Sequence, residues 1–146
     1  MNADDVRPAR PDDLRAIRAV ARAAYAPYVE RLGFEPPPMV QDFVEVLPST
    51  IVFDDGAVRG YAVRRVERTH MLLENVAADP AVRGRGVGRT LIARVEAEAA
   101  ALGLPVELYT NEAMHENLAL YPRLGYAEFD RRTEHGLHRV FFRKRP

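Results

Sequence analysis

The chain has 146 residues, of which 47% are hydrophobic and 29% charged, and its 21 basic and 21 acidic side chains cancel. This size and composition are typical of one ordinary globular domain, so we expect a single domain over residues 1–146. A net charge of zero gives no overall attraction to nucleic acid or to an acidic membrane surface. Because the chain has no cysteine, disulfides, thiolate metal sites and cysteine nucleophiles are excluded.

The N-terminal sequence Met-Asn-Ala-Asp-Asp is acidic and lacks an apolar stretch, which predicts that there is no signal peptide. No apolar run approaches the ~20 residues of a membrane span. We therefore expect a cytoplasmic protein without membrane or nucleic-acid partners.

The N-terminal third predicts a short strand followed by helices. Residues 6–9 form the candidate strand, and Pro11 and Asp12 open a helix with Asp12 as its cap. The apolar side chains that recur at helical spacing are Leu14, Ile17, Val20, Ala21 and Ala24. Pro27 is expected to end this helix, and a second short helix is expected over 28–32.

A proline-rich segment, Glu35-Pro36-Pro37-Pro38-Met39, predicts an extended loop. Residues 41–47 are expected to form one or two helical turns. Three antiparallel strands are predicted next, the first two joined by a hairpin turn at Asp54-Asp55-Gly56: 50–53, 57–66 and 70–78.

The second half predicts alternating helices and strands. An apolar stripe predicts a helix over 87–102 that Gly103 ends. The remaining elements are a strand over 105–110, a helix over 114–124 followed by Gly125, and a hairpin of 129–132 and 137–143. This order predicts an α/β (α+β) fold, a mixed sheet with helices on both faces.

Residues 79–89, which join the strand 70–78 to the helix 87–102, combine glycine with arginine. Gly84, Gly86 and Gly88 remove side chains where the backbone turns, so backbone N–H groups can converge on one oxyanion. The helix that follows adds N–H donors and the positive end of its dipole. The charges are added by Arg83, Arg85 and Arg89. The segment predicts a diphosphate-binding loop.

Other interpretations of this loop are tested by spacing. A Walker loop needs Gly-Lys-Ser/Thr, and the chain's one lysine is Lys144. A dinucleotide fingerprint needs a third glycine at 89 or 91, where Arg89 and Leu91 stand. Glu107 does lie about where a ribose-binding acid is expected, so this alternative stays open. A plain strand-to-helix turn stays open too.

Two blocks of the sequence resemble the GNAT superfamily of acyl-CoA-dependent N-acetyltransferases. The pattern Arg83-x-x-Gly86-x-Gly88 matches the family's Arg/Gln-x-x-Gly-x-Gly/Ala signature, and residues 117–126 resemble its second block. The resemblance implies a mostly antiparallel sheet of about seven strands, with parallel but splayed strands at 70–78 and 105–110. It also implies acetyl-CoA as co-substrate, and no metal.

The same resemblance implies roles for individual residues. Acetyl-CoA would bind at Val76, Ala77, Ala78, Arg83, Gly84, Arg85, Gly86, Val87, Gly88, Arg89 and Asn117, with the Val76 N–H directed at the thioester carbonyl. Tyr121 would be the general acid, although an aromatic core residue is the alternative. By position in the family, the acceptor would contact Tyr25, Tyr28, Phe34 and Met39.

Glu74 is the candidate general base. Strand alternation predicts that His70, Leu72, Glu74 and Val76 share one face, which would place Glu74 close to the reaction centre. A structural carboxylate paired with an arginine, and a water chain in place of a fixed base, stay open. His135 and His138 with Glu134 lack a third spaced ligand, so we expect no metal site.

These features and the family resemblance together predict an N-acetyltransferase that transfers the acetyl group of acetyl-CoA to a primary amine by direct attack in a ternary complex. The acceptor is a small-molecule or peptide amine that the sequence does not identify, and a homodimer is left open. The alternatives are a non-catalytic acyl-CoA-binding or sensor domain and a nucleotide-binding module.

Overall fold

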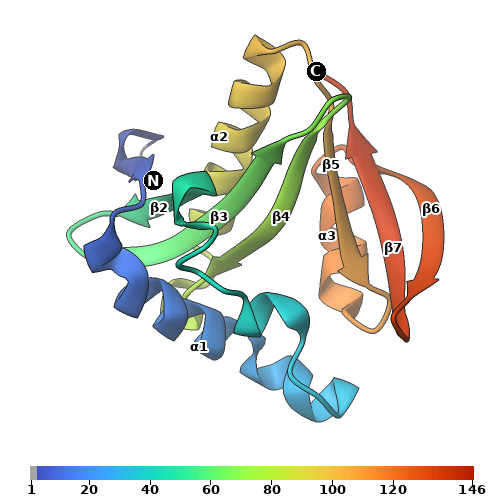
Figure 1. The fold of residues 1–146 in the computed structure, drawn as a ribbon, viewed down its shortest axis with the longest axis horizontal. Coiled ribbons are helices and arrows are strands. Elements are labelled where there is room, and N and C mark those ends of the chain that lie inside the picture. Colours follow the sequence, from blue (N-terminus) through green and yellow to red (C-terminus); the bar gives the residue numbers. More distant parts are fainter. Residues whose placement is uncertain (1–2) are drawn as a thin grey trace.

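Seven strands form one mixed sheet in the computed structural model, which describes residues 3–146 (Figure 1). In the order β1-β2-β3-β4-β5-β7-β6, the strands are β1 (Val6–Pro8), β2 (Thr50–Asp54), β3 (Val58–Val66), β4 (Met71–Ala78), β5 (Val106–Asn111), β7 (Leu137–Lys144) and β6 (Ala127–Glu134). Every neighbouring pair is antiparallel except β4 and β5. The expected mixed, mostly antiparallel sheet is confirmed. The first two residues of the acidic N-terminal segment, used above to predict the lack of a signal peptide, lie outside the described residues.

Helices cover both faces of this sheet. They are α1 (Leu14–Leu32), α2 (Val87–Ala101) and α3 (His115–Arg123). On one face α1 packs through Ile17 and Val20 against residues of β2 and β3 such as Val52 and Tyr61. On the other face α2 and α3 share a second hydrophobic core with residues of β2 to β5 and β7. None of the helices in the described residues is long and apolar enough to cross a membrane.

The predicted break at Pro27 is wrong, because α1 continues through this residue to Leu32 as one helix. Pro27 is solvent-exposed and removes a single backbone hydrogen bond, whereas the apolar face of α1 is buried along its length. Gly33 ends the helix as expected, with φ at 82° and its N–H donating to the Val29 carbonyl at 2.8 Å.

Three local expectations on either side of α1 are also corrected. The exposed Asp12 is not the cap; instead the neighbouring Asp13 carboxylate accepts the Arg10 N–H at 2.7 Å. The proline segment is not extended throughout, since Pro37–Val40 forms a 3₁₀ turn, which the fixed φ of proline also permits. In place of helical turns over 41–47, the chain makes a hydrogen-bonded turn and then a 3₁₀ segment, Leu47–Ser49.

Two irregularities in the centre of the sheet shape the site. First, β4 and β5 pair only at Met71 with Val106 and at Leu72 with Glu107, and then diverge, as the predicted splay requires. Second, the register between β3 and β4 shifts so that Val63 faces Asn75 and Arg64 faces Leu73. Residue 74 is left over as a β-bulge, which re-aims the side chains that follow.

Candidate active site

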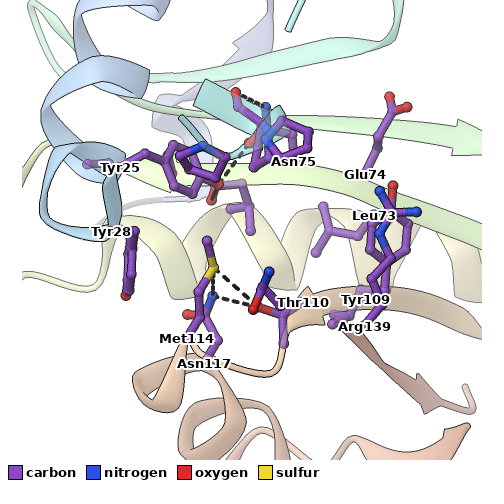
Figure 2. Close-up of a pocket in the computed structure, with 18 of the residues that line it drawn as sticks. Tyr25, Tyr28, Leu73, Glu74, Asn75, Tyr109, Thr110, Met114, Asn117 and Arg139 are labelled. Carbon is purple, nitrogen blue, oxygen red and sulfur yellow. Dashed lines mark hydrogen bonds between the residues drawn. The ribbon is translucent and has the colours of Figure 1, made fainter. Parts of the chain in front are cut away.

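The diverging strands β4 and β5 enclose a pocket of about 320 Å³. Figure 2 shows the side chains that line it, which come from α1, the proline segment, β4, β5, α3 and β7. Among the predicted site residues, the pocket brings together Tyr25, Tyr28, Glu74, Val76, Ala77, Asn117 and Tyr121. Phe34 and Met39 are not part of its lining: Phe34 is 43% exposed, and Met39 packs against the core beneath α1.

The bulge overturns the prediction that His70, Leu72, Glu74 and Val76 share one face. Both Glu74 and Asn75 bond to residues on the α1 side of the sheet, whereas Val76 packs against the core beneath α2. One extra residue in the strand reverses the alternation from there onward. Nothing in the apolar–polar pattern of 70–78 marks this position.

The main chain of Val76 nonetheless faces the splay. The Asp79 N–H donates to the Arg59 carbonyl at 2.8 Å, so alternation along the antiparallel pair directs Ala77 toward β3 and Val76 away from it. On that open side the Val76 carbonyl accepts the Tyr25 hydroxyl at 3.1 Å. The Val76 N–H is therefore directed into the splay.

Asn75, which the sequence analysis did not single out, is the centre of a buried polar network. Its Oδ1 accepts the hydroxyls of Tyr25 at 2.9 Å and Tyr61 at 3.0 Å, and its Nδ2 donates to the Pro38 carbonyl at 3.0 Å and to Gln41 Oε1 at 2.8 Å. Burial raises the pKa of both tyrosines, so their hydroxyls stay protonated and donate. The network fixes the proline segment against β4. An asparagine within an apolar strand was the signal that could have found it.

Glu74 is held by an arginine, as one of the open alternatives stated. Its Oε2 accepts Arg65 Nε at 3.0 Å and Gln41 Nε2 at 3.2 Å. Its Oε1 has no hydrogen-bond partner among residues 3–146, and the side chain lines the pocket. Glu74 is therefore ion-paired through Oε2, and its side chain contributes to the pocket lining.

Tyr121 packs in the core through its ring and also lines the pocket. Its ring packs in the core, 5.7 Å from the ring of Tyr126 and 5.8 Å from that of Phe142. Its hydroxyl bonds to no described residue and borders the pocket. Burial raises the pKa of Tyr121 to about 12, so the hydroxyl is a hydrogen-bond donor at neutral pH. Nearby, Asn117 is oriented by the bond from its Nδ2 to Thr110 Oγ1 at 3.1 Å.

The glycine loop presents backbone donors without acceptors. Gly84 and Gly86 adopt φ of 82° and 80°, a region that favours glycine. The backbone N–H groups of Arg83 and Arg85 donate within the loop, to the Pro80 carbonyl at 3.1 Å and to the Val82 carbonyl at 3.2 Å. By contrast, across the described chain no acceptor is recorded for the N–H groups of Gly84, Gly86, Val87 and Gly88.

These N–H groups stand where α2 begins, so the positive end of a 15-residue helix adds to them. Three exposed guanidinium groups lie along the same segment and form no ion pair with a described residue: Arg83, Arg85 and Arg89. The residues present therefore fit a polyanion such as the diphosphate of a coenzyme. By comparison Glu107, the candidate ribose acid, is ion-paired with Arg143 at 2.8 Å.

A parallel strand pair that opens into a pocket and is followed by a glycine loop with open backbone donors is the arrangement expected of the GNAT type. The model of the Acetyltransferase (GNAT) family matches residues 16–126, and the chain belongs to this family. A comparison with curated proteins found no match.

Solved structures of the same fold cover almost the whole chain. They include the ribosomal-protein-S18-alanine N-acetyltransferase from Escherichia coli (TM-score 0.76, 19% identity, 96% of this chain and 92% of that chain). Ard1 from Thermoplasma volcanium has a TM-score of 0.74 at 18% identity, and the match covers 96% of this chain and 95% of that chain. Naa20 from Chaetomium thermophilum, in complex with a bisubstrate analogue, has a TM-score of 0.71 at 20% identity, and the match covers 96% of this chain and 85% of that chain. Identities this low establish the fold alone.

Proposed function

We propose that the protein is an N-acetyltransferase that moves the acetyl group of acetyl-CoA to a primary amine by direct attack, with both substrates bound at once. One observation carries this proposal most strongly. The loop N–H groups without acceptors stand at one end of the splay, and the pocket within the splay holds Glu74 and Tyr121. The candidate anion-binding loop thus directly follows the strand whose splay holds the candidate acid–base groups.

The chain offers donors for each part of acetyl-CoA. The loop N–H groups and the three arginines would bind the diphosphate. The main chain of Val76 and the side chain of Asn117 would hydrogen-bond the amides of the pantetheine arm, as an added strand would. When bound, acetyl-CoA supplies the acetyl group as a thioester, and the Val76 N–H is the donor available to its carbonyl oxygen.

Tyr121 acts on the departing sulfur by donating a hydrogen bond. Because its pKa of about 12 is higher than the ~8.5 of an ordinary thiol, complete transfer of its proton to a thiolate is unfavourable. The hydroxyl therefore stabilises the departing thiolate by a hydrogen bond, and the proton that the attacking amine releases on forming the amide balances the charge on the sulfur. At the other side of the pocket, Glu74 Oε1 can accept a proton from an ammonium group directly or through water.

Release of the CoA thiol on mixing the protein with acetyl-CoA and a panel of primary amines tests the proposal. An N-acetyltransferase releases the thiol in an amine-dependent manner, whereas an acyl-CoA sensor binds acetyl-CoA and releases none. Thermal shifts with CoA, NAD and ATP identify the ligand, because a ligand bound by the native state raises the apparent stability. Stabilisation by NAD or ATP and not by CoA would contradict the assignment.

A further inference from the structure

One end of the pocket carries its two charged residues, Glu74 and Arg139, among the residues that line it. Continuing the parallel register from the Leu72–Glu107 pair places Glu74 level with Tyr109 across the splay. Val106, Leu108 and Thr110 are buried on the far side of β5, so Tyr109 faces the α1 side, as Glu74 does. Figure 2 shows Glu74, Tyr109 and Arg139 at one end of the pocket, with Tyr28, Met114 and Asn117 at the other.

Arg139 is held rigidly with one edge of its guanidinium unused. The group lies over the Tyr109 ring, 4.5 Å from its centroid, and Nη1 donates to Glu134 Oε2 at 3.0 Å. The side chain is 17% exposed. Within the described chain, Nε and Nη2 have no recorded acceptor. These two nitrogens form the edge of a guanidinium that binds a carboxylate through two parallel hydrogen bonds.

The position of Glu74 and Arg139 relative to the reaction centre indicates that they contact the acceptor. The glycine loop follows the carboxyl end of β4, and Val76 precedes it by a few residues. Glu74 lies two residues before Val76 on the same strand, further from the loop. The coenzyme would enter from the loop end, so the end with Glu74, Tyr109 and Arg139 is left for the amine.

We propose that the acceptor is a free amino acid, whose ammonium group faces Glu74 while its carboxylate binds the Nε and Nη2 edge of Arg139. This inference rests on the proposed N-acetyltransferase activity. Each charged group in the pocket then meets an opposite charge, although both also keep a partner in the protein, Arg65 for Glu74 and Glu134 for Arg139. An amine without a carboxylate would leave the open edge of Arg139 without an anion.

The test compares each amino acid with its own carboxamide as acceptor, over a panel of α-, β- and γ-amino acids, by release of the CoA thiol. Wild type, Arg139→Gln and Arg132→Gln are measured. Arg132 is the matched control, since it lies on the same hairpin and stacks on Phe141 at 4.4 Å but is not part of the pocket lining. The quantity compared is the ratio of kcat/KM for acid to amide. Differences in amine basicity cancel when this ratio is compared between variants.

We expect Arg139→Gln to lower the ratio roughly ten- to a hundredfold, the loss expected for a hydrogen-bonded charge, and Arg132→Gln to leave it unchanged. Arg139→Lys should restore part of the acid-to-amide ratio, because an ammonium group keeps the positive charge but lacks the two parallel donors of the guanidinium. A merely structural role for Arg139 would lower kcat/KM equally for the amino acid and for its amide. An unchanged acid-to-amide ratio in Arg139→Gln, with amines still acetylated, would therefore overturn this inference and leave the proposed function standing. If no amine in the panel is acetylated, the proposed function fails and the inference fails with it.

Discussion

Tyr121 places a reactive hydroxyl on a side chain whose ring is part of the core. Because that hydroxyl bonds to no described residue, Tyr121→Phe should change the free energy of unfolding by less than about 0.5 kcal/mol. We expect kcat to fall about ten- to a hundredfold with little change in the affinity for acetyl-CoA. Steady-state kinetics and isothermal titration measure the two quantities.

Tyr126→Phe is the matched control for this prediction. The Tyr126 hydroxyl donates to Glu96 at 2.8 Å and does not line the pocket, so its loss should affect stability and leave kcat unchanged. If Tyr121→Phe kept the kcat of the wild type, Tyr121 would be a packing residue only.

Asn75 is a buried polar side chain with several hydrogen-bond partners, so its removal should lower the free energy of unfolding. Asn75→Ala leaves the buried Tyr25 and Tyr61 hydroxyls without their Oδ1 acceptor, which should lower the free energy of unfolding by about 2–4 kcal/mol in urea titrations. In a Tyr61→Phe background the same change should cost less, because the Tyr61 hydroxyl is the one left without an acceptor, whereas the Tyr25 hydroxyl keeps the Val76 carbonyl. Equal costs in both backgrounds would contradict the described network.

At the scale of elements, the glycine loop combines backbone conformation and charge. Gly86→Glu introduces a carboxylate where an anion is expected and forces a side chain onto a φ of 80°. We expect acetyl-CoA binding to be lost in isothermal titration. Gly103→Glu is the control, because Gly103 also has a positive φ, of 70°, but lies beyond the other end of α2. Retention of affinity within a few-fold by Gly86→Glu would exclude the loop as the diphosphate site.

The elements differ in how far the sequence predicts them. The loop and its helix were predictable because glycine spacing, arginines and an apolar stripe all indicate the same structure. The continuity of α1 was not, because local propensity at Pro27 is overruled by packing of distant residues against the helix. The bulge at residue 74 depends on the register with β3, a tertiary property with no local pattern.

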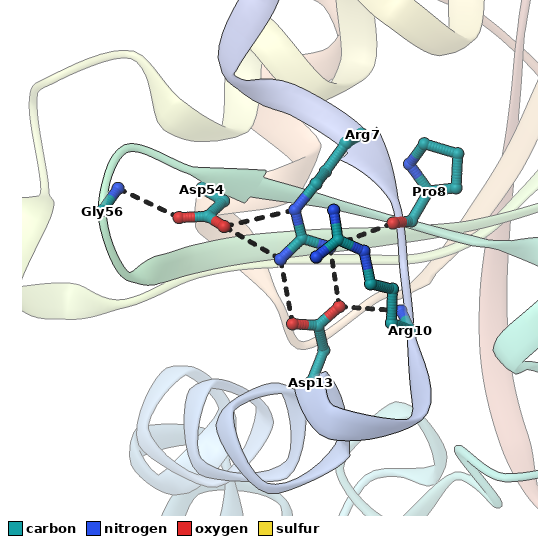
Figure 3. A network of polar contacts seen from close by, with 6 residues as sticks. All are labelled: Arg7, Pro8, Arg10, Asp13, Asp54 and Gly56. Carbon is teal, nitrogen blue, oxygen red and sulfur yellow. Dashed lines mark hydrogen bonds and ion pairs between the residues drawn. The ribbon is translucent and has the colours of Figure 1, made fainter.

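At the scale of the whole molecule, Arg7 ties three parts of the chain together (Figure 3). Its guanidinium donates to both oxygens of Asp13, at 2.8 and 3.0 Å, and to Asp54 Oδ2 at 2.8 Å. The network joins β1, the start of α1 and the end of β2. These hydrogen bonds lower the pKa of Asp13 and of Asp54.

This network predicts how stability depends on pH. Because the folded pKa values are lower than the ordinary value of about 3.9, the folded state binds fewer protons than the unfolded state in acid. The stabilisation is thus present above the ordinary pKa, and it is lost as the pH falls from about 5 through the lowered pKa. Asp13→Asn should remove about 2 kcal/mol at pH 7 and flatten this acid dependence in urea titrations. Asp12→Asn, at the exposed neighbour, should do neither; a wild-type acid slope in Asp13→Asn would contradict the assignment.

The global arrangement of strands and the family were predictable from the sequence, since the element order gives seven strands and the loop, and the family resemblance carried by two motifs implies the splay. The candidate site was predictable only in part. Tyr121 and Glu74 were expected in the site and line the pocket, but Asn75, Gln41 and Arg139 reach it through contacts between segments far apart in the chain. Phe34 and Met39 do not line the pocket, and the turn at Pro37–Val40, held by Asn75 through the Pro38 carbonyl, has no local pattern that predicts it.

The central claim is that the backbone of the glycine loop binds the diphosphate of acetyl-CoA, and amide NMR tests it residue by residue. In a titration of ¹⁵N-labelled protein with acetyl-CoA, the largest amide shifts should occur at Gly84, Gly86, Val87 and Gly88, whose N–H groups have no acceptor recorded in the described structure. Gly56 and Gly103, outside the loop, should hardly move. Saturating acetyl-CoA that left the four loop amides unshifted would contradict the account.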